Sequence, residues 1–304
     1  MLKVEKIFKS FAEKEVLKGI SLELHEGEIY GLIGKNGAGK TTLMNIIAMV
    51  LQSDSGKIFV DGKEIKTLND LSGQIGYVID IPSAFEYLTP MQYLEFLLSP
   101  KGLTKTEIKI KSMEALVKLN LEDSANKQIK TFSRGMKQRM GIASGIICDP
   151  KIIIFDEPSS ALDPEGRSEV LQIIDNLAKE GKVVLLSTHI LDDIERICDK
   201  IGILIDGKIV LEGSTQQITE QFSYNIVCVE CSKDDRVLIK NKLSTKEYIT
   251  SVNDTPKGVE VSFEKVLPQK VFKDVLTVAK TTSSIKVKTM TLEELFIKLN
   301  KGEK

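Results

Sequence analysis

Two stretches of consecutive apolar residues dominate the hydrophobic pattern of this chain. Residues 151–157, KIIIFDE, and residues 182–189, KVVLLSTH, are rich in β-branched side chains, which is typical of parallel strands buried on both faces. Between them, residues 164–181 place apolar side chains at helical spacing and end at Gly181, a common helix stop. The pattern predicts a strand, crossover helix, strand unit and therefore an α/β fold.

The first third of the chain predicts further strands and one buried helix. Residues 2–11 and 17–34 read as strands, and the second of them runs into a glycine-rich loop. The helix expected at residues 40–51, KTTLMNIIAMVL, is apolar on nearly every face, so it should be buried against a sheet. Residues 56–65 predict a hairpin through Asp61-Gly62. An antiparallel β subdomain beside the parallel sheet is expected.

Helical periodicity replaces the strand pattern over about residues 85–150, which predicts a helical subdomain. Residues 200–213, KIGILIDGKIVLEG, then predict a closing hairpin. We place the end of this first domain at residue 218.

A second domain, residues 219–304, is predicted to be α+β with a ferredoxin-like order. The strands are expected at 225–231, 247–252, 259–264 and 284–289, with a turn at 253–258 and helices at 234–243 and 268–280. This is the β-α-β-β-α-β order of ferredoxin-like domains. A last helix, TLEELFIKLN, begins with a capping box of Thr291 and Glu294. Ligand sensing, dimerisation and a spacer role all remain open for this domain.

Composition narrows the functional classes. Lys plus Arg number 42 and Asp plus Glu number 43, a formal charge of −1, which argues against a nucleic-acid binder with a broad basic surface. The longest uncharged stretch has 13 residues, whereas a membrane-spanning helix needs about 20, and the first residues show no secretory signal. Cys228 and Cys231 form a C-x-x-C within an alternating strand, so reduced thiols are expected there rather than a metal or redox site.

A phosphate-binding loop is the clearest chemical motif. GKNGAGKT, from Gly34 to Thr41, fits G-x-x-x-x-G-K-[ST] at every fixed position. Its backbone N–H groups and the following helix N-terminus would meet phosphate charge, Lys40 would reach the β- and γ-phosphates, and Thr41 would face Mg²⁺. The alternative is a glycine-rich turn that fits by chance. The predicted ATP-binding residues are Gly34, Lys35, Asn36, Gly37, Ala38, Gly39, Lys40, Thr41 and Thr42.

Two carboxylates and a histidine follow the buried strands. Asp156 and Glu157 end the strand at 152–156, at the edge where ligands bind in such sheets. We expect Asp156 to hold Mg²⁺ through water and Glu157 to orient or deprotonate the attacking water. His189 ends the next strand, where it would reach a γ-phosphate. An exposed acidic loop and a satisfied strand-end histidine are the alternatives.

In this order, the P-loop, a Ser-Gly stretch before a helix, Asp-Glu, SALD and a terminal histidine resemble the nucleotide-binding domain of an ATP-binding cassette (ABC) ATPase over about residues 1–218. The resemblance implies catalytic roles for Glu157, His189 and Lys40. It also implies that two cassettes pack head to tail, so that the signature of one closes over ATP on the other. The signature residues in this chain are Ser133, Arg134, Gly135 and Met136.

Other matching positions follow from the same resemblance. Phe11 matches the aromatic that stacks on adenine, with core packing as the alternative. Asp163 matches the loop that contacts the opposite P-loop, although Asp163 and Ser133 could also be plain helix caps. Asp80 stands where most relatives have a glutamine, and a carboxylate there could ligate Mg²⁺. The acidic residue followed by x-Pro resembles the bacitracin and lantibiotic export ATPases.

The resemblance therefore implies a Mg-dependent ATPase subunit of an ABC transporter. It would bind ATP and Mg²⁺, pair with a second copy or a sibling cassette, and drive a separate membrane permease from the inner face of the cell membrane. Cargo of the antibiotic peptide, drug or lipid-like class is expected, with motion transmitted through the helical subdomain and residues 80–87. The rival is a non-transport ABC ATPase acting on ribosomes or DNA, which the single cassette and lack of sustained heptads disfavour.

Overall fold

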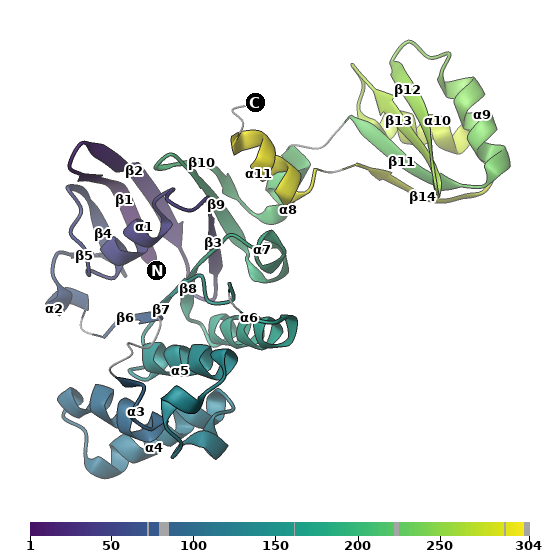
Figure 1. The fold of residues 1–304 in the computed structure, drawn as a ribbon. Helices are drawn as coiled ribbons and strands as arrows, with labels where there is room; N and C mark the ends of the chain where they lie inside the picture. The colour runs from purple at the N-terminus through teal and green to yellow at the C-terminus, as the bar shows by residue number, and fades with distance from the viewer. Residues whose placement is uncertain (72, 79–84, 161, 222–224, 289, 301–304) are drawn as a thin grey trace. The chain divides into compact units, whose positions relative to one another are not determined.

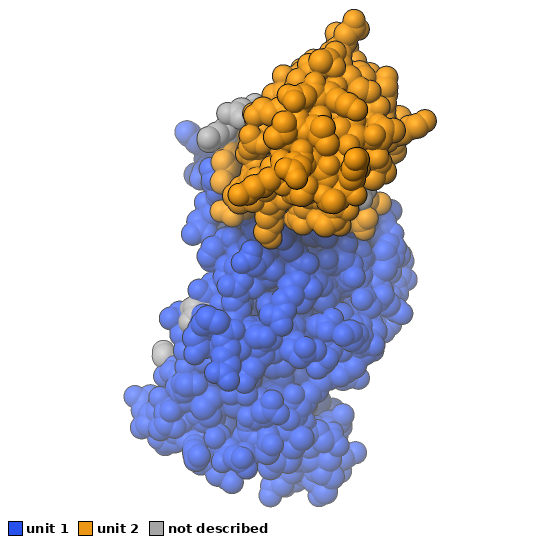
Figure 2. Space-filling model, turned by 90° about the vertical axis from the view of Figure 1, so that its right-hand side faces the viewer, with its two compact units in different colours: residues 1–215 blue, residues 216–304 orange. Residues whose placement is uncertain are grey.

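The computed structural model describes residues 1–71, 73–78, 85–160, 162–221, 225–288 and 290–300. The chain forms two compact units, Met1–Thr215 and Gln216–Lys304, coloured separately in Figure 2. The predicted boundary at residue 218 lies inside helix α8, Thr215–Gln221. Among the described residues, no helix combines the length and the apolar character needed to cross a bilayer.

A six-stranded sheet with the order β10-β9-β3-β8-β7-β6 forms the centre of the first unit (Figure 1). All neighbouring strands are parallel except β10, which closes a hairpin on β9, so the predicted mixed sheet is confirmed. The strands are β3 (Ile29–Ile33), β6 (Ile75–Val78), β7 (Ile152–Asp156), β8 (Val183–Thr188), β9 (Lys200–Ile205) and β10 (Lys208–Gly213).

Helices cover both faces of this sheet, which explains the unbroken apolar runs of its strands. Ile152 and Ile154 of β7 belong to the same core cluster as Leu43 and Ile47 of α1, Lys40–Ile47. On the other face, a Cβ at Gly31 would meet the side chain of Ile194 in α7, Leu191–Ile197, at 2.5 Å. The crossover helix α6, Pro164–Lys179, packs on β8. Both faces of β7 and β8 are therefore covered and buried.

A second, antiparallel sheet with the order β2-β1-β4-β5 shares its core with α1 and the central sheet. Its strands are β1 (Leu2–Phe11), β2 (Lys14–Leu24), β4 (Ser55–Val60) and β5 (Lys63–Ile65), and the short helix α2 (Leu68–Leu71) follows. Asp61 and Gly62 form the predicted β4–β5 turn, both with positive φ. The expected antiparallel β subdomain is thus present.

Three helices, connected by short 3₁₀ turns, make up the helical subdomain. They are α3 (Pro90–Leu98), α4 (Lys105–Lys118) and α5 (Arg134–Ile146), with turns η2 (Ser99–Lys101), η3 (Glu122–Ser124) and η4 (Ile129–Thr131). Thr89 and Thr104 each begin a helix with a complete capping box. Because both caps satisfy free N–H groups of the first turn, the starts of α3 and α4 are specified locally.

The second unit has the predicted ferredoxin-like arrangement. Its sheet order is β12-β13-β11-β14, every pair is antiparallel, and α9 and α10 contact each other on a common core. The elements are β11 (Ile226–Cys231), α9 (Lys233–Leu243), β12 (Ile249–Thr255), β13 (Gly258–Phe263), α10 (Pro268–Val278), β14 (Thr282–Val287) and α11 (Leu292–Asn300). Thr291 and Glu294 form the expected capping box of α11.

Two details of this unit bear on the sequence predictions. The turn expected at residues 253–258 is shorter, because Asn253 and Asp254 continue β12 by pairing with Glu260 and Val259. Cross-strand pairing there outweighs the turn preference of Asn and Asp. Cys231 packs against the core, whereas Cys228 lies beside Glu260 at 3.8 Å. Within the described residues no three His, Cys, Asp or Glu side chains gather as a metal site.

Candidate nucleotide-binding site

The P-loop connects β3 to α1 and depends on glycines with restricted surroundings. Gly39 precedes the first residue of α1 with φ 111°, a conformation that residues with a Cβ rarely adopt. A Cβ there would also lie 2.8 Å from a methyl group of Leu17. At Gly34 a Cβ would come within 2.8 Å of the Leu204 carbonyl oxygen. The loop can therefore wrap closely only because these positions are glycine.

Lys40 folds back over this loop. Its side chain is only 5% exposed, and its Nζ donates a hydrogen bond to the Gly34 carbonyl oxygen at 2.8 Å. The same Nζ lies 3.3 Å from Glu157 Oε1. A buried ammonium group requires such partners, since burying an unpaired charge is costly. The lysine thus connects the P-loop with the carboxylate that follows β7.

The two predicted carboxylates have different partners. Asp156 Oδ2 accepts a hydrogen bond from Thr41 Oγ1 at 2.7 Å, and its Oδ1 accepts one from Ser187 Oγ. Glu157 Oε2 lies 2.5 Å from His189 Nδ1. The structure therefore brings together all five side chains predicted at the carboxyl ends of β3, β7 and β8, namely Lys40, Thr41, Asp156, Glu157 and His189.

Glu157 has an unusual backbone. Its φ is 52°, in the left-handed region that residues with a side chain seldom occupy. Its N–H lies 3.1 Å from both the carbonyl oxygen and the Oγ of Ser187. Strained backbone persists where the surroundings hold it, and it is concentrated at functional sites. Contacts with Ser187 therefore hold the end of β7 in the conformation that presents the Glu157 carboxylate.

Sequence reasoning missed two residues beside these carboxylates. Ser187 is fully buried in β8 and contacts both Asp156 and the Glu157 backbone. Tyr77 of β6 has its pKa raised to about 12, first by burial and then by the negative charge of Asp156. Only the adjacency of β6, β7 and β8 in the sheet connects these residues, so no sequence motif could have indicated them.

An open pocket of about 470 Å³ lies over the P-loop. Its lining includes Phe11, Lys14 and Val16 from the β1–β2 hairpin region, P-loop residues, and Glu157. Phe11 is 48% exposed, with Lys9 Nζ 5.4 Å from its ring centroid. The aromatic ring is thus available to a planar group, and the core-packing alternative for Phe11 is not what the structure shows. Asn36, Gly37, Gly39, Lys40, Thr41 and Thr42 form the rest of the lining.

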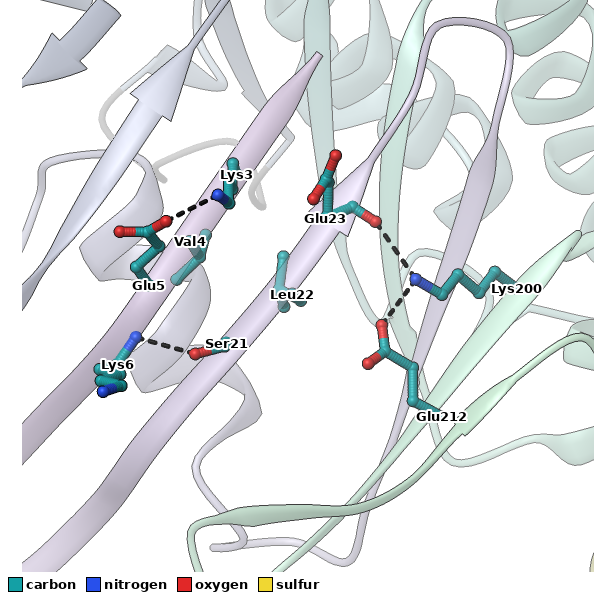
Figure 3. A pocket seen from close by; sticks show the side chains of 9 residues that line it. All are labelled: Lys3, Val4, Glu5, Lys6, Ser21, Leu22, Glu23, Lys200 and Glu212. Carbon is teal, nitrogen blue, oxygen red and sulfur yellow. Dashed lines mark hydrogen bonds and ion pairs between the residues drawn. The ribbon is translucent and has the colours of Figure 1, made fainter. Parts of the chain in front are cut away.

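A second pocket, of about 670 Å³, lies between β1–β2 and β9–β10 (Figure 3). It is larger than the P-loop pocket, but charged side chains in its lining already form ion pairs. Lys3 pairs with Glu5 at 2.7 Å, and Lys200 pairs with Glu212 at 2.8 Å. Two of its lysines are therefore paired with glutamates of the same pocket, whereas the lining of the P-loop pocket combines glycine backbone, the buried Lys40 and the carboxylate of Glu157. The P-loop pocket is therefore the candidate nucleotide-binding site.

The signature residues lie elsewhere, at the start of α5. Ser133 caps this helix by accepting a hydrogen bond from the Met136 N–H at 3.3 Å, and a Cβ at Gly135 would meet nothing within 4 Å. Arg134 and Ser133 are exposed. In Figure 1, α5 lies with α3 and α4, away from α1, and no signature residue lines the P-loop pocket. The structure does not bring the two motifs of one chain together.

Asp163 and Asp80 are the two remaining acidic residues predicted from the sequence. Asp163 is exposed and caps α6, accepting a hydrogen bond from the Gly166 N–H at 2.9 Å. Asp80 falls outside the described residues. The Thr41 hydroxyl and the Asp156 carboxylate lie side by side, where Thr41 could contact Mg²⁺ and Asp156 could hold it through water; this cation takes few protein ligands and completes its shell with phosphates and water. The donor set fits that cation.

Comparisons with known proteins agree with this geometry. The ABC transporter family model matches residues 17–160. YxlF, an uncharacterized ABC transporter ATP-binding protein of Bacillus subtilis, is 33% identical over 98% of this chain and 99% of its own. The lantibiotic transport ATP-binding protein SrtF of Streptococcus pyogenes is 34% identical over 75% of this chain and 98% of its own.

Among solved structures, a dimeric post-hydrolysis state of the ATP-binding cassette MJ0796, bound to ADP and phosphate, matches with a TM-score of 0.64. It is 27% identical and covers 70% of this chain and 98% of that one. The resemblance expected from the motifs is therefore confirmed at the level of sequence and fold. This chain belongs to the ABC transporter family, as one of its ATP-binding proteins.

Proposed function

We propose that this ABC ATPase closes head to tail with a second cassette around two Mg-ATP molecules and drives export through a separate membrane permease. One observation carries the catalytic part: Lys40, Glu157 and His189 meet at the carboxyl ends of adjacent parallel strands, beside the Thr41–Asp156 pair. This set of groups can bind a polyphosphate, hold its counter-ion and activate water. In this proposal, the protein acts at the inner face of the cell membrane.

The contacts of Lys40 and His189 suggest how ATP alters the site. Both groups hold the Glu157 carboxylate, one at each oxygen. A bound γ-phosphate is a stronger partner for Lys40 because it carries more negative charge, and His189 can donate to the same phosphate. Phosphate binding would thereby free Glu157 to orient or deprotonate water. Thr41 and Asp156 would hold Mg²⁺, which neutralises phosphate charge when bound.

The signature motif supports dimerisation. Ser133 and the first N–H groups of α5 form an exposed helix N-terminus, which is an anion-binding arrangement when a second copy presents ATP. Arg134, Gly135 and Met136 continue that first turn, and Asp163 would meet the opposite P-loop from the exposed start of α6. The similar cassette MJ0796 has a dimeric structure with ADP and phosphate bound. A homodimer is the simplest assembly because one chain carries both halves of the site.

The proposed cargo rests on the relatives. SrtF is named as a lantibiotic transport protein, and its alignment includes three quarters of this chain. We therefore propose an antibiotic peptide or another amphipathic, drug-like or lipid-like compound. The rival function, action on ribosomes or DNA, lacks a favouring observation. No nucleic-acid partner is proposed.

Affinity purification distinguishes the transport function from action on ribosomes or DNA. Tagged Glu157→Gln protein, isolated from mild-detergent membrane extracts with and without Mg-ATP, should recover a polytopic membrane protein that mass spectrometry identifies. Recovery of the membrane protein should depend on nucleotide binding by the cassette. Lys40→Met protein, treated identically, is the control for nucleotide binding. Ribosomal proteins or DNA in place of a membrane protein would contradict the transport proposal while leaving the ATPase chemistry intact.

Phe11→Ala is expected to weaken ATP binding by about tenfold, since stacking of a base on an aromatic ring contributes roughly 1–3 kcal/mol. Triphosphate alone, which has no base to stack, should bind both proteins equally. Isothermal titration calorimetry of both ligands measures this directly. Phe8→Leu is the matched control, because Phe8 lies on the same strand but does not line the P-loop pocket. Equal ATP affinity of Phe11→Ala and wild type would contradict the stacking role.

A further inference from the structure

A buried carboxylate connects three segments of the candidate site. Asp193, in the first turn of α7, is 1% exposed. Its Oδ2 accepts a hydrogen bond from Ser159 Oγ at 2.6 Å, and its Oδ1 accepts one from Arg167 Nε at 2.5 Å. Ser159 is also 1% exposed, so this contact is closed to solvent. Each carboxylate oxygen thus has its own donor, from a different segment.

The positions of these three residues in the sequence relate them to the chemistry. Ser159 follows Glu157 by two residues, and Asp193 follows His189 by four. Arg167 lies one turn into α6, where its N–H bonds the Asp163 carbonyl oxygen at 2.9 Å. The cluster therefore joins the segments that follow two residues expected to act on ATP and water, Glu157 and His189. It does not line the P-loop pocket.

We propose that Asp193 is a positioning residue, which through Ser159 and Arg167 holds the loop after Glu157 and the start of α6 in register with the segment after His189. This inference rests on the proposed roles of Glu157 and His189. Two physical arguments support it. A strained backbone such as that of Glu157 needs neighbours that hold it in place. The ion pair of the buried Asp193 with Arg167, which is 28% exposed, also adds little net stability against the desolvation cost of the carboxylate, so its benefit here is geometric.

Ser159 is the residue to change, because its loss leaves Asp193 paired with Arg167 and keeps the buried charge compensated. Ser159→Ala removes one hydrogen bond, and Ser159→Thr retains the hydroxyl. Ser168→Ala is the matched control. Its Oγ accepts a hydrogen bond from Arg196 Nη2 at 3.0 Å, which joins the same two helices without contacting Asp193.

Ser159→Ala is expected to lower kcat for Mg-ATP hydrolysis by about tenfold while KM for ATP stays within about twofold, because small misplacement of catalytic groups slows chemistry more than binding. Ser159→Thr and Ser168→Ala should retain kcat near that of wild type. Thermal unfolding and ATP titration of each variant separate misplacement from instability.

Three outcomes would overturn the inference. The first is a kcat of Ser159→Ala equal to that of Ser168→Ala. The second is a kcat loss that Ser159→Thr does not restore. The third is a kcat loss accompanied by an equal loss of ATP affinity and a lower Tm, which would make the contact merely structural. Absence of Mg-ATPase activity in wild type itself would instead refute the proposed function, and the positioning role with it.

Discussion

Glu157→Gln is expected to lower kcat for ATP hydrolysis by about 10²- to 10⁴-fold, the effect of removing a positioned general base. The carboxylate stands at the end of β7, with Oε1 3.3 Å from Lys40 Nζ and Oε2 2.5 Å from His189 Nδ1. A glutamine side chain has nearly the same size and still accepts one hydrogen bond, but it does not take up a proton at neutral pH. Phosphate release under saturating Mg-ATP measures the loss.

The same variant should bind ATP and accumulate as a nucleotide-bound dimer, because in the proposed cycle ATP binding closes the dimer and hydrolysis reopens it. Size-exclusion chromatography with light scattering, with and without Mg-ATP, detects that dimer. Glu165→Gln, an exposed carboxylate in the first turn of α6, is the control for removing one negative charge nearby. A hydrolysis rate of Glu157→Gln equal to that of Glu165→Gln would rule out the proposed catalytic role.

Lys40→Met is expected to weaken Mg-ATP binding by about 10- to 150-fold, since a hydrogen bond to a charged group contributes roughly 1.5–3 kcal/mol. Lys40 is 5% exposed and already lies inside the loop that would enclose the phosphates. Methionine keeps an unbranched side chain that is one atom shorter, but it removes the charge and the three donors. Isothermal titration calorimetry with Mg-ATP gives the two dissociation constants.

Lys35→Met provides the control within the same loop, because the Lys35 side chain is exposed. We expect its ATP affinity to stay near that of wild type, since Lys35 would serve through its backbone. Thermal unfolding of both variants shows whether either substitution disturbs the fold. Equal affinities of Lys40→Met and Lys35→Met would show that the buried ammonium group is not needed for nucleotide binding.

The sequence by itself determined the fold class and the location of the chemistry. The apolar runs at 151–157 and 182–189 predicted strands covered on both faces, and the structure places α1 on one face and α6 and α7 on the other. Residues that favour tight turns were equally informative: a turn was predicted at Asp61-Gly62, and both residues have the positive φ of such a turn. Motifs at the ends of separate strands were then predicted to lie close together, because parallel strands direct their carboxyl ends to one edge of the sheet.

Only the tertiary structure decided which groups support those motifs. Ser187 contacts Asp156 from the neighbouring strand β8, and the charge of Asp156 contributes to the raised pKa of Tyr77 in β6. Ser159, Arg167 and Asp193 meet from three separate segments. These contacts have no local sequence pattern, because each depends on strand order and helix packing rather than on spacing along the chain. The turn predicted at 253–258 is present but shorter than expected for the same reason: cross-strand pairing with Glu260 and Val259 extends β12 through residues that favour turns when taken alone.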